Sequence, residues 1–172
     1  MSDNEFIQGD AGAANITLVE AGRRKPGSLL MMKGEFPCKV VSFSTAKPGK
    51  HGSAKAMITG KDIFTDKQYE ETFGTGDMIQ APVVSNTEYT CIDCTPEGVL
   101  QLLSADGNMK EDVSLPSASH LKDLEKQLRS ILEEGKKEAL VRIQKWGDIE
   151  QMIAVREGAD IWWSRYCWHR NL

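Results

Sequence analysis

Residues 44–55 run Ser44-Thr45-Ala46-Lys47-Pro48-Gly49-Lys50-His51-Gly52-Ser53-Ala54-Lys55. β-Branched and apolar residues precede this stretch at 37–43 and follow it at 56–60, whereas its proline and glycines interrupt regular structure. The pattern predicts a β-hairpin with a basic loop at its end. Glycines on both sides leave little bulk around Lys50, so we expect that side chain to be accessible.

Charge is divided unevenly along the 172 residues. Residues 1–20 contain four acids and no Lys or Arg, residues 21–61 contain nine Lys or Arg against one acid, and residues 62–172 contain twelve bases against twenty acids. The three segments therefore carry net charges of −4, +8 and −8. Such a basic segment fits a polyanionic partner that meets one face, and it fits a solvated basic face equally well.

Length and composition favour two small domains, because 40% of the residues are hydrophobic and short strand-like segments dominate. We interpret residues 1–20 as a mobile acidic tail and residues 21–84 as a small barrel of about five strands. Residues 81–86 are interpreted as a linker, with the boundary near residue 84. No window approaches the ~18 apolar residues of a membrane span and the N-terminus is acidic, so we expect a cytoplasmic protein without membrane contact.

The second unit combines strand-like segments with one helix. Leucine and isoleucine recur at helical spacing between residues 119 and 134, with Ser117 or Ser119 as the N-cap and Gly135 as the end. The strands are expected at 89–92, 98–103 and 109–115 before the helix and at 138–144 after it. This order of elements is typical of an OB-fold.

Two further features leave alternatives open. Cys91 and Cys94 have the spacing of a zinc or redox pair, but no second pair follows, so we favour two small residues within a strand at 88–94. Three of the four tryptophans fall within residues 162–168, beside Arg165 and Arg170. These aromatic residues could stack on bases, cover an apolar surface or dock on a protein partner, and we favour packing.

Several motifs together carry a resemblance to a known family. They are Lys33-Gly34, Pro37-Cys38-Lys39-Val40-Val41, Ser44-Thr45, the run from Lys47 to Lys55, Asp62-Ile63-Phe64-Thr65, Glu111-Asp112 and Leu115-Pro116, with Gly9-Asp10-Ala11-Gly12-Ala13 near the start. Over roughly residues 5–155 the chain resembles translation initiation factor 5A, the eukaryotic and archaeal relative of bacterial elongation factor P. Pro48 and Ser53 look more like the archaeal members, since eukaryotic members commonly have Thr and His there.

The resemblance implies an all-β fold, with an SH3-like barrel at 21–84 followed by an OB-fold barrel at 85–155 that carries one prominent helix. Residues 156–172 are then a Trp-rich C-terminal extension. Lys50 is implied to be the lysine that deoxyhypusine synthase and deoxyhypusine hydroxylase convert to hypusine, with spermidine as the source of the added group. The chain itself is then the substrate of these enzymes, and it needs no cofactor, metal or small-molecule substrate.

The family's function implies a translation factor that binds the ribosome near the E site, in contact with rRNA and P-site tRNA. There it promotes peptide bond formation in elongation, including relief of polyproline stalling, and it also acts in termination, by presenting modified Lys50 to the peptidyl-tRNA. The residues expected at the tRNA and ribosome are Lys47, Gly49, Lys50, His51, Gly52 and Lys55.

Two other functions were weighed. The first alternative is a generic tandem-barrel RNA-binding or ribosomal protein in which Lys50 is unmodified. An enzyme is disfavoured, because the histidines at 51, 120 and 169 are scattered and no catalytic or metal-binding motif is complete.

Overall fold

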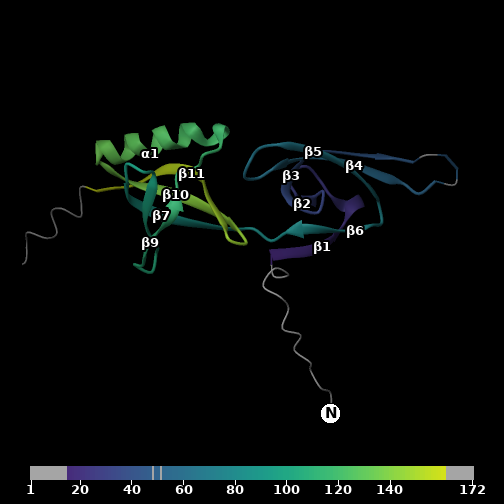
Figure 1. Ribbon diagram of the computed structural model, residues 1–172, viewed down its shortest axis with the longest axis horizontal. Helices are drawn as coiled ribbons and strands as arrows, with labels where there is room; N and C mark the ends of the chain where they lie inside the picture. Colours follow the sequence, from purple (N-terminus) through teal and green to yellow (C-terminus); the bar gives the residue numbers. More distant parts are fainter. Residues whose placement is uncertain (1–14, 48, 51, 162–172) are drawn as a thin grey trace, which may run out of the picture. The chain divides into compact units, whose positions relative to one another are not determined.

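The computed structural model describes residues 15–47, 49–50 and 52–161. The chain divides into two compact units between Val84 and Ser85. In both units the strands that pair are antiparallel (Figure 1). None of the helices in the described part of the chain is long and apolar enough to span a membrane.

The described part of unit 1 contains a four-stranded sheet and a two-stranded sheet. Its strands are β1 (Ile16–Glu20), β2 (Leu29–Met32), β3 (Phe36–Ala46), β4 (Lys55–Asp62), β5 (Gln68–Gly74) and β6 (Met78–Pro82), with a short 3₁₀ helix at Ala21–Arg23 after β1. The larger sheet has the order β2-β3-β4-β5, and β1 pairs with β6. The core between them contains Ala21, Leu30, Met32, Cys38, Val40, Ala56, Ile58 and Ile79.

A bulge interrupts the pairing of β3 with β4. Val40 lies opposite Gly60 but Ser42 lies opposite Thr59, which leaves Val41 as the extra residue. Bulges bend a strand and increase its twist. Gly60 allows close packing beneath this point, because a Cβ there would lie 2.7 Å from the sulfur of Met32.

The described part of unit 2 is a five-stranded sheet with one α-helix. Its elements are β7 (Ser85–Cys94), β8 (Val99–Leu103), β9 (Met109–Ser114), a 3₁₀ turn (Ser119–Leu121), α1 (Lys122–Glu134), β10 (Lys137–Trp146) and β11 (Ile149–Asp160). The strand order is β11-β10-β7-β8-β9. An ion pair of 2.8 Å between Lys110 of β9 and Glu150 of β11 joins the two edge strands, so the sheet curls round toward closure.

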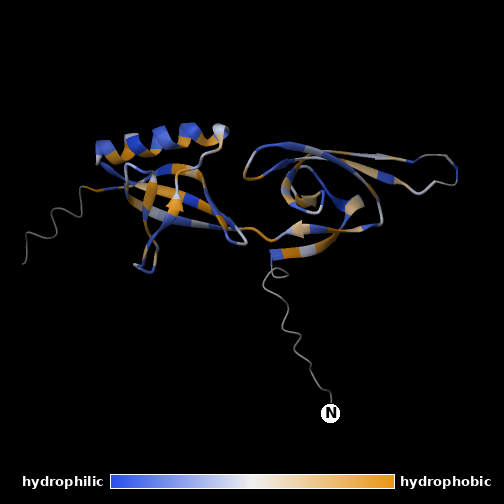
Figure 2. Cartoon of the chain, in the orientation of Figure 1, coloured by the Kyte–Doolittle hydropathy of each residue, from blue (hydrophilic) through white to orange (hydrophobic). Residues whose placement is uncertain are grey.

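The helix packs its apolar side on the core of unit 2. Leu128 is fully buried, and Leu124, Ile131 and Leu132 pack against the strands. Figure 2 shows the same division, with hydrophobic residues on the side of α1 that faces the sheet and hydrophilic residues on the outer side. The predicted amphipathic helix is thus confirmed.

The helix ends as expected but begins differently. Gly135 adopts a left-handed conformation (φ 60°), and its N–H donates to the carbonyl of Ile131 at 3.2 Å. The predicted N-caps, Ser117 and Ser119, are wrong. The α-helix begins at Lys122 after the 3₁₀ turn, so both serines precede the N-cap position, which Leu121 occupies without a side-chain bond.

Three predicted boundaries also change. The acidic tail was expected to reach residue 20, but Ile16–Glu20 form β1, because β6 supplies a pairing partner from far along the chain. Residues 1–14 lie outside the described part. The linker expected at 81–86 shrinks to Val83 and Val84, since β6 continues to Pro82 and β7 starts at Ser85. The expected end of the OB-fold unit at residue 155 falls inside β11, whose pairing with β10 continues to Asp160.

Candidate functional site

The predicted basic loop lies between β3 and β4 at the end of their hairpin (Figure 1). Ala46 and Lys55 are the last paired residues, so the strands continue closer to the loop than the sequence pattern indicated. Gly49 and Lys50 form a turn, and both are exposed. The hairpin thus places Lys50, an exposed residue, at its tip.

Glycine at position 49 serves the backbone conformation. Gly49 has a φ of +72°, and an added Cβ would meet nothing within 4 Å. A side chain would therefore have room, but this left-handed conformation costs an L-residue roughly 1–2 kcal/mol. Gly49 lets the chain reverse immediately before Lys50.

Hydrogen bonds hold the base of the loop to the rest of unit 1. The carbonyl of Ala54 accepts a bond from the N–H of Thr75 at 3.0 Å, and the carbonyl of Thr75 accepts one from Gly22 at 2.8 Å. Asp77 secures the same turn, because its carboxylate accepts from the N–H of Gly74 at 2.6 Å. The sequence pattern did not indicate this support, because two of the three bonds join only backbone groups, which leave no side-chain pattern.

The remaining predicted contact residues share this loop. Lys47 and Lys55 are exposed at its two ends, and Gly52 is half-buried between them. His51, like Pro48, lies outside the described residues. The structure therefore brings together Lys47, Gly49, Lys50, Gly52 and Lys55 on one hairpin.

A basic face leads along the sheet toward the loop. Lys55 and Lys61 lie on the same side of β4, because alternate residues of a strand share a face. Lys39 of β3 lies directly opposite Lys61, and Glu70 of β5 lies opposite Thr59. Lys61 also forms an ion pair of 3.4 Å with Asp66, which offsets part of the repulsion between the two opposed lysines. Counting charges revealed the basic segment, but the strand register reveals that part of it forms one face.

The two spaced cysteines lie in β7, as the favoured interpretation expected. Cys91 is buried in the core of unit 2, and its thiol donates to the carbonyl of Asp93 at 3.3 Å. Burial is the main reason that the pKa of Cys91 rises to about 12, with the nearby Cys94 and Asp93 adding to the effect. A thiol held protonated is a poor nucleophile and a poor metal ligand. Within the described ranges, no group of three or more His, Cys, Asp or Glu residues is arranged to hold a metal ion.

Comparison with family models places both units. Residues 14–77 match the family described as "Translation initiation factor 5A-like, N-terminal". Residues 83–156 match the family described as "Eukaryotic elongation factor 5A hypusine, DNA-binding OB fold". The chain is therefore a translation factor, built as an all-β protein of two domains, and the predicted SH3-like and OB-fold classes are confirmed.

Individual relatives agree with this class. The chain is 39% identical over 162 residues to eukaryotic translation initiation factor 5A of Dictyostelium discoideum, which covers 91% of this chain and 98% of that protein. It is 38% identical over 159 residues to factor 5A-3 of Arabidopsis thaliana, with the same coverage. The chain belongs to the translation initiation factor 5A family.

Solved structures of the family have the same fold. A factor 5A family protein of Naegleria fowleri superimposes with a TM-score of 0.75 at 33% identity, covering 83% of this chain and 99% of that chain. The factor from Methanococcus jannaschii gives a TM-score of 0.62 at 23% identity, with coverage of 83% and 96%, and supports the fold alone. The resemblance inferred from the sequence motifs is thus confirmed.

Proposed function

We propose that this chain is a cytoplasmic, hypusine-bearing translation factor that binds the ribosome near the E site. Lys50 is the modified residue: deoxyhypusine synthase adds the aminobutyl group of spermidine, and deoxyhypusine hydroxylase completes the side chain. The chain is the substrate of these enzymes and takes no catalytic part in either modification. The single observation that carries the proposal is the exposure of Lys50 at the tip of a braced hairpin.

The geometry suits a residue that must be both modified and presented. An enzyme can surround an amine at an exposed turn, because Gly49 adds no side chain beside it. The bonds from Thr75 to Ala54 and from Gly22 to Thr75 limit how far the loop base can move. A long side chain on a braced loop can therefore reach a distant target with less loss of conformational entropy.

The mechanism requires positioning alone. Lys47 and Lys55 flank the tip, and Lys39 and Lys61 lie on the sheet behind it, where they can contact phosphates of rRNA and P-site tRNA. Gly49, His51 and Gly52 complete the contact set proposed for the loop. With the backbone phosphates so held, hypusine is presented to the peptidyl-tRNA and favours the geometry in which the peptide bond forms. Positioning of this kind explains how the factor promotes peptide bond formation between consecutive prolines, where the reactants are poorly aligned.

A second candidate deserves a direct test, because the basic face alone would suit a generic RNA-binding or ribosomal protein. That function needs only the charge of Lys50 and leaves the residue unmodified. Lys50→Arg keeps the charge but lacks the primary amine that receives the aminobutyl group. In a proline-stalled translation assay with both modifying enzymes present, we expect Lys50→Arg to lose the stimulation and Lys47→Arg to keep it. Full activity of Lys50→Arg would refute the hypusine proposal and favour the generic RNA-binding function.

A further inference from the structure

Unit 2 carries a groove between α1 and β11 that the proposed function does not use. One hollow of about 210 Å³ is lined by Ile131, Glu134, Lys136, Lys137 and Glu157. A second, of about 490 Å³, is lined by Gln127, Ser130, Ile131, Glu134, Val155, Arg156 and Glu157. Because the hollows share three lining residues, they form one continuous depression, which we call the α1–β11 groove.

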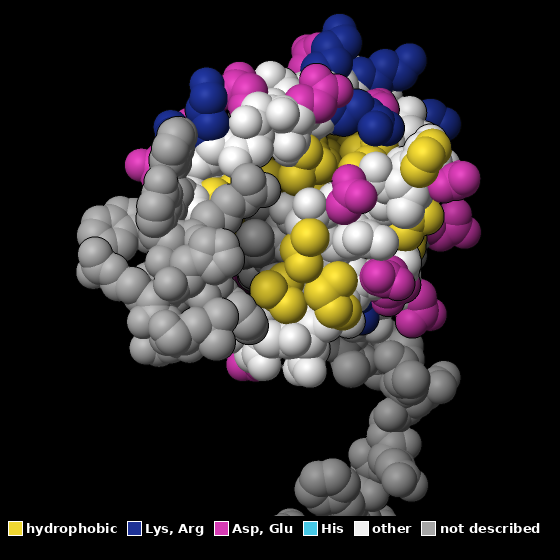
Figure 3. Space-filling model, turned by 90° about the vertical axis from the view of Figure 1, so that its left-hand side faces the viewer, with side chains coloured by type: hydrophobic (Ala, Val, Ile, Leu, Met, Phe, Trp, Pro, Cys, Tyr) yellow, Lys and Arg dark blue, Asp and Glu magenta, His cyan; other side chains and the backbone are white. Residues whose placement is uncertain are grey.

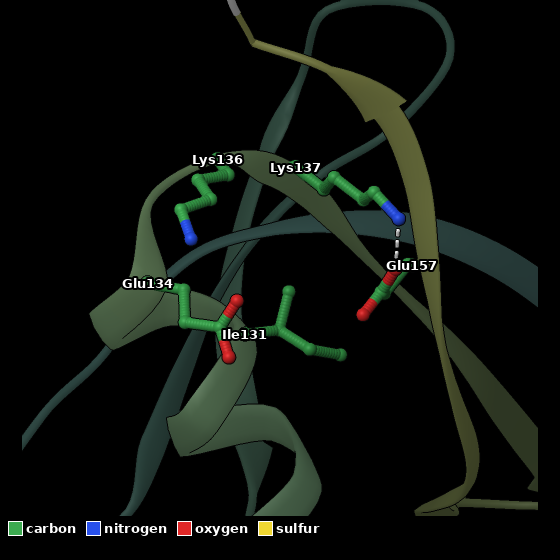
Figure 4. Close-up of a pocket in the computed structure, with 5 residues that line it drawn as sticks. All are labelled: Ile131, Glu134, Lys136, Lys137 and Glu157. Atoms are coloured by element: carbon green, nitrogen blue, oxygen red, sulfur yellow. Dashed lines mark hydrogen bonds and ion pairs between the residues drawn. The ribbon is translucent and has the colours of Figure 1, made fainter.

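The groove has an apolar floor and charged rims. Ile131 and Val155 are half-buried and pack against the core of unit 2. Figure 4 shows Ile131 between Glu134 on the helix and the ion pair of Lys137 with Glu157 across the two strands. The helical wall presents residues 127, 130, 131 and 134, which lie on one face of α1 because their spacing follows the helical repeat.

One face of the molecule mixes apolar and charged side chains. In Figure 3, hydrophobic side chains come to the surface between patches of Lys or Arg and patches of Asp or Glu. An apolar floor bordered by both signs of charge fits an occupant that has aromatic side chains and its own charges.

The chain itself delivers such an occupant to the groove. The N–H of Ile161 donates to the carbonyl of Lys136 at 2.8 Å, so the chain leaves β11 beside a residue that lines the groove. The next eleven residues are Trp162-Trp163-Ser164-Arg165-Tyr166-Cys167-Trp168-His169-Arg170-Asn171-Leu172. They include three tryptophans, one tyrosine and two arginines, and they contain no Asp or Glu.

We propose that residues 162–172 dock in the α1–β11 groove of the same molecule. From residue 127 to residue 134 the helical wall is about 10 Å long, which an extended segment spans in three or four residues. An extended segment of this length can bring one indole of Trp162 or Trp163 onto the apolar floor formed by Ile131 and Val155, and Arg165 near the carboxylate of Glu134. Adjacent side chains of an extended segment point to opposite sides, so one of the two indoles faces the floor in either orientation.

Hydrogen exchange with mass spectrometry on the full chain tests this docking. We expect amides in peptides from residues 162–172 to exchange at least about tenfold more slowly than their intrinsic rates. Glu134→Lys should remove most of that protection, because it places a cation where Arg165 binds. The matched control is Glu133→Lys, which makes the same change at the next exposed position of α1, outside the groove.

A second variant tests whether residues 162–172 need the space inside the groove. Ser130 is exposed, so Ser130→Arg fills the groove without disturbing the core, and it should also release residues 162–172. Exchange of residues 162–172 at intrinsic rates in the unmodified sequence would overturn the proposal. So would protection that survives both groove variants. Protection that grows with protein concentration would overturn docking within one molecule and would point to a second copy as the occupant.

Discussion

Gly22 is the residue whose replacement tests the support of the loop most sharply. A Cβ at position 22 would lie 2.7 Å from the carbonyl oxygen of Thr75 and 3.0 Å from its Cβ. The nearest atom is backbone, so relief requires the turn to shift. That shift weakens the bond from Gly22 to Thr75 and, through Thr75, the bond that holds Ala54 at the base of the loop.

The cost can be estimated from these contacts. Overpacking a well-packed site costs about 1–3 kcal/mol, and the loss of one backbone hydrogen bond costs about 1 kcal/mol. Replacing glycine by alanine lowers the entropy of the unfolded chain, which stabilises the folded state by about 0.4–1 kcal/mol. The Gly22→Ala variant should therefore destabilise unit 1 by about 2 kcal/mol.

Hydrogen exchange resolves this loss unit by unit. A loss of about 2 kcal/mol makes amides of β3, β4 and Thr75 exchange roughly 30-fold faster, while amides of unit 2 keep their rates. The control is Gly76→Ala in the same turn, where φ is not left-handed and an added Cβ meets nothing within 4 Å. If Gly22→Ala leaves exchange in unit 1 within a factor of two of the original, or matches Gly76→Ala, the proposed support is wrong.

Three further results follow from the structure. Lys50→Ala should change the unfolding free energy by less than about 0.5 kcal/mol in urea titrations, because the side chain is exposed. The same variant should lose its stimulation of proline-stalled translation. A large loss of stability would contradict the exposed position of Lys50. Burial opposes ionisation of Glu150, but hydrogen bonds from Lys110 and Lys145 outweigh it and lower its pKa. A lowered carboxyl pKa stabilises the folded state above the unfolded value of 4.5, and the gain disappears as the pH falls through the folded value. Glu150→Gln should therefore flatten the fall in melting temperature at acid pH, and an unchanged pH profile would count against this network. Iodoacetamide at pH 8 should alkylate Cys91 at least about a hundredfold more slowly in the folded chain than in urea, since burial raises its pKa to about 12; equal rates would refute its burial.

Local sequence signals predicted much of the fold. The alternating segments around the loop and the leucine spacing up to Gly135 each match one element, because hairpins and amphipathic helices are determined largely by nearby residues. β1 was not predicted, because its partner β6 lies some sixty residues away and the preceding acidic segment suggested a tail. β11 was not predicted for a similar reason. Charged residues and Gly158 obscure the alternation of apolar and polar residues along it, and its position depends on pairing with β10.

The candidate site was predictable in its position but not in its support. The proline, glycine and lysine content of residues 44–55 was sufficient to predict an exposed basic loop with Lys50 near its tip. The bond from Thr75 to Ala54 joins backbone atoms of distant residues, so no side-chain pattern indicates it. The basic face of Lys39, Lys55 and Lys61 likewise depends on the register set by the bulge at Val41.

The mass of the peptide that contains Lys50, taken from the protein purified from its native host, tests the central claim most directly. We predict an increase equal to one aminobutyl group, with one further oxygen when hydroxylation is complete, and fragmentation that assigns both to Lys50. The peptide that contains Lys39 provides the internal control and should be unmodified. An unmodified Lys50 in the native host, or an aminobutyl group on another lysine, would contradict the proposed function.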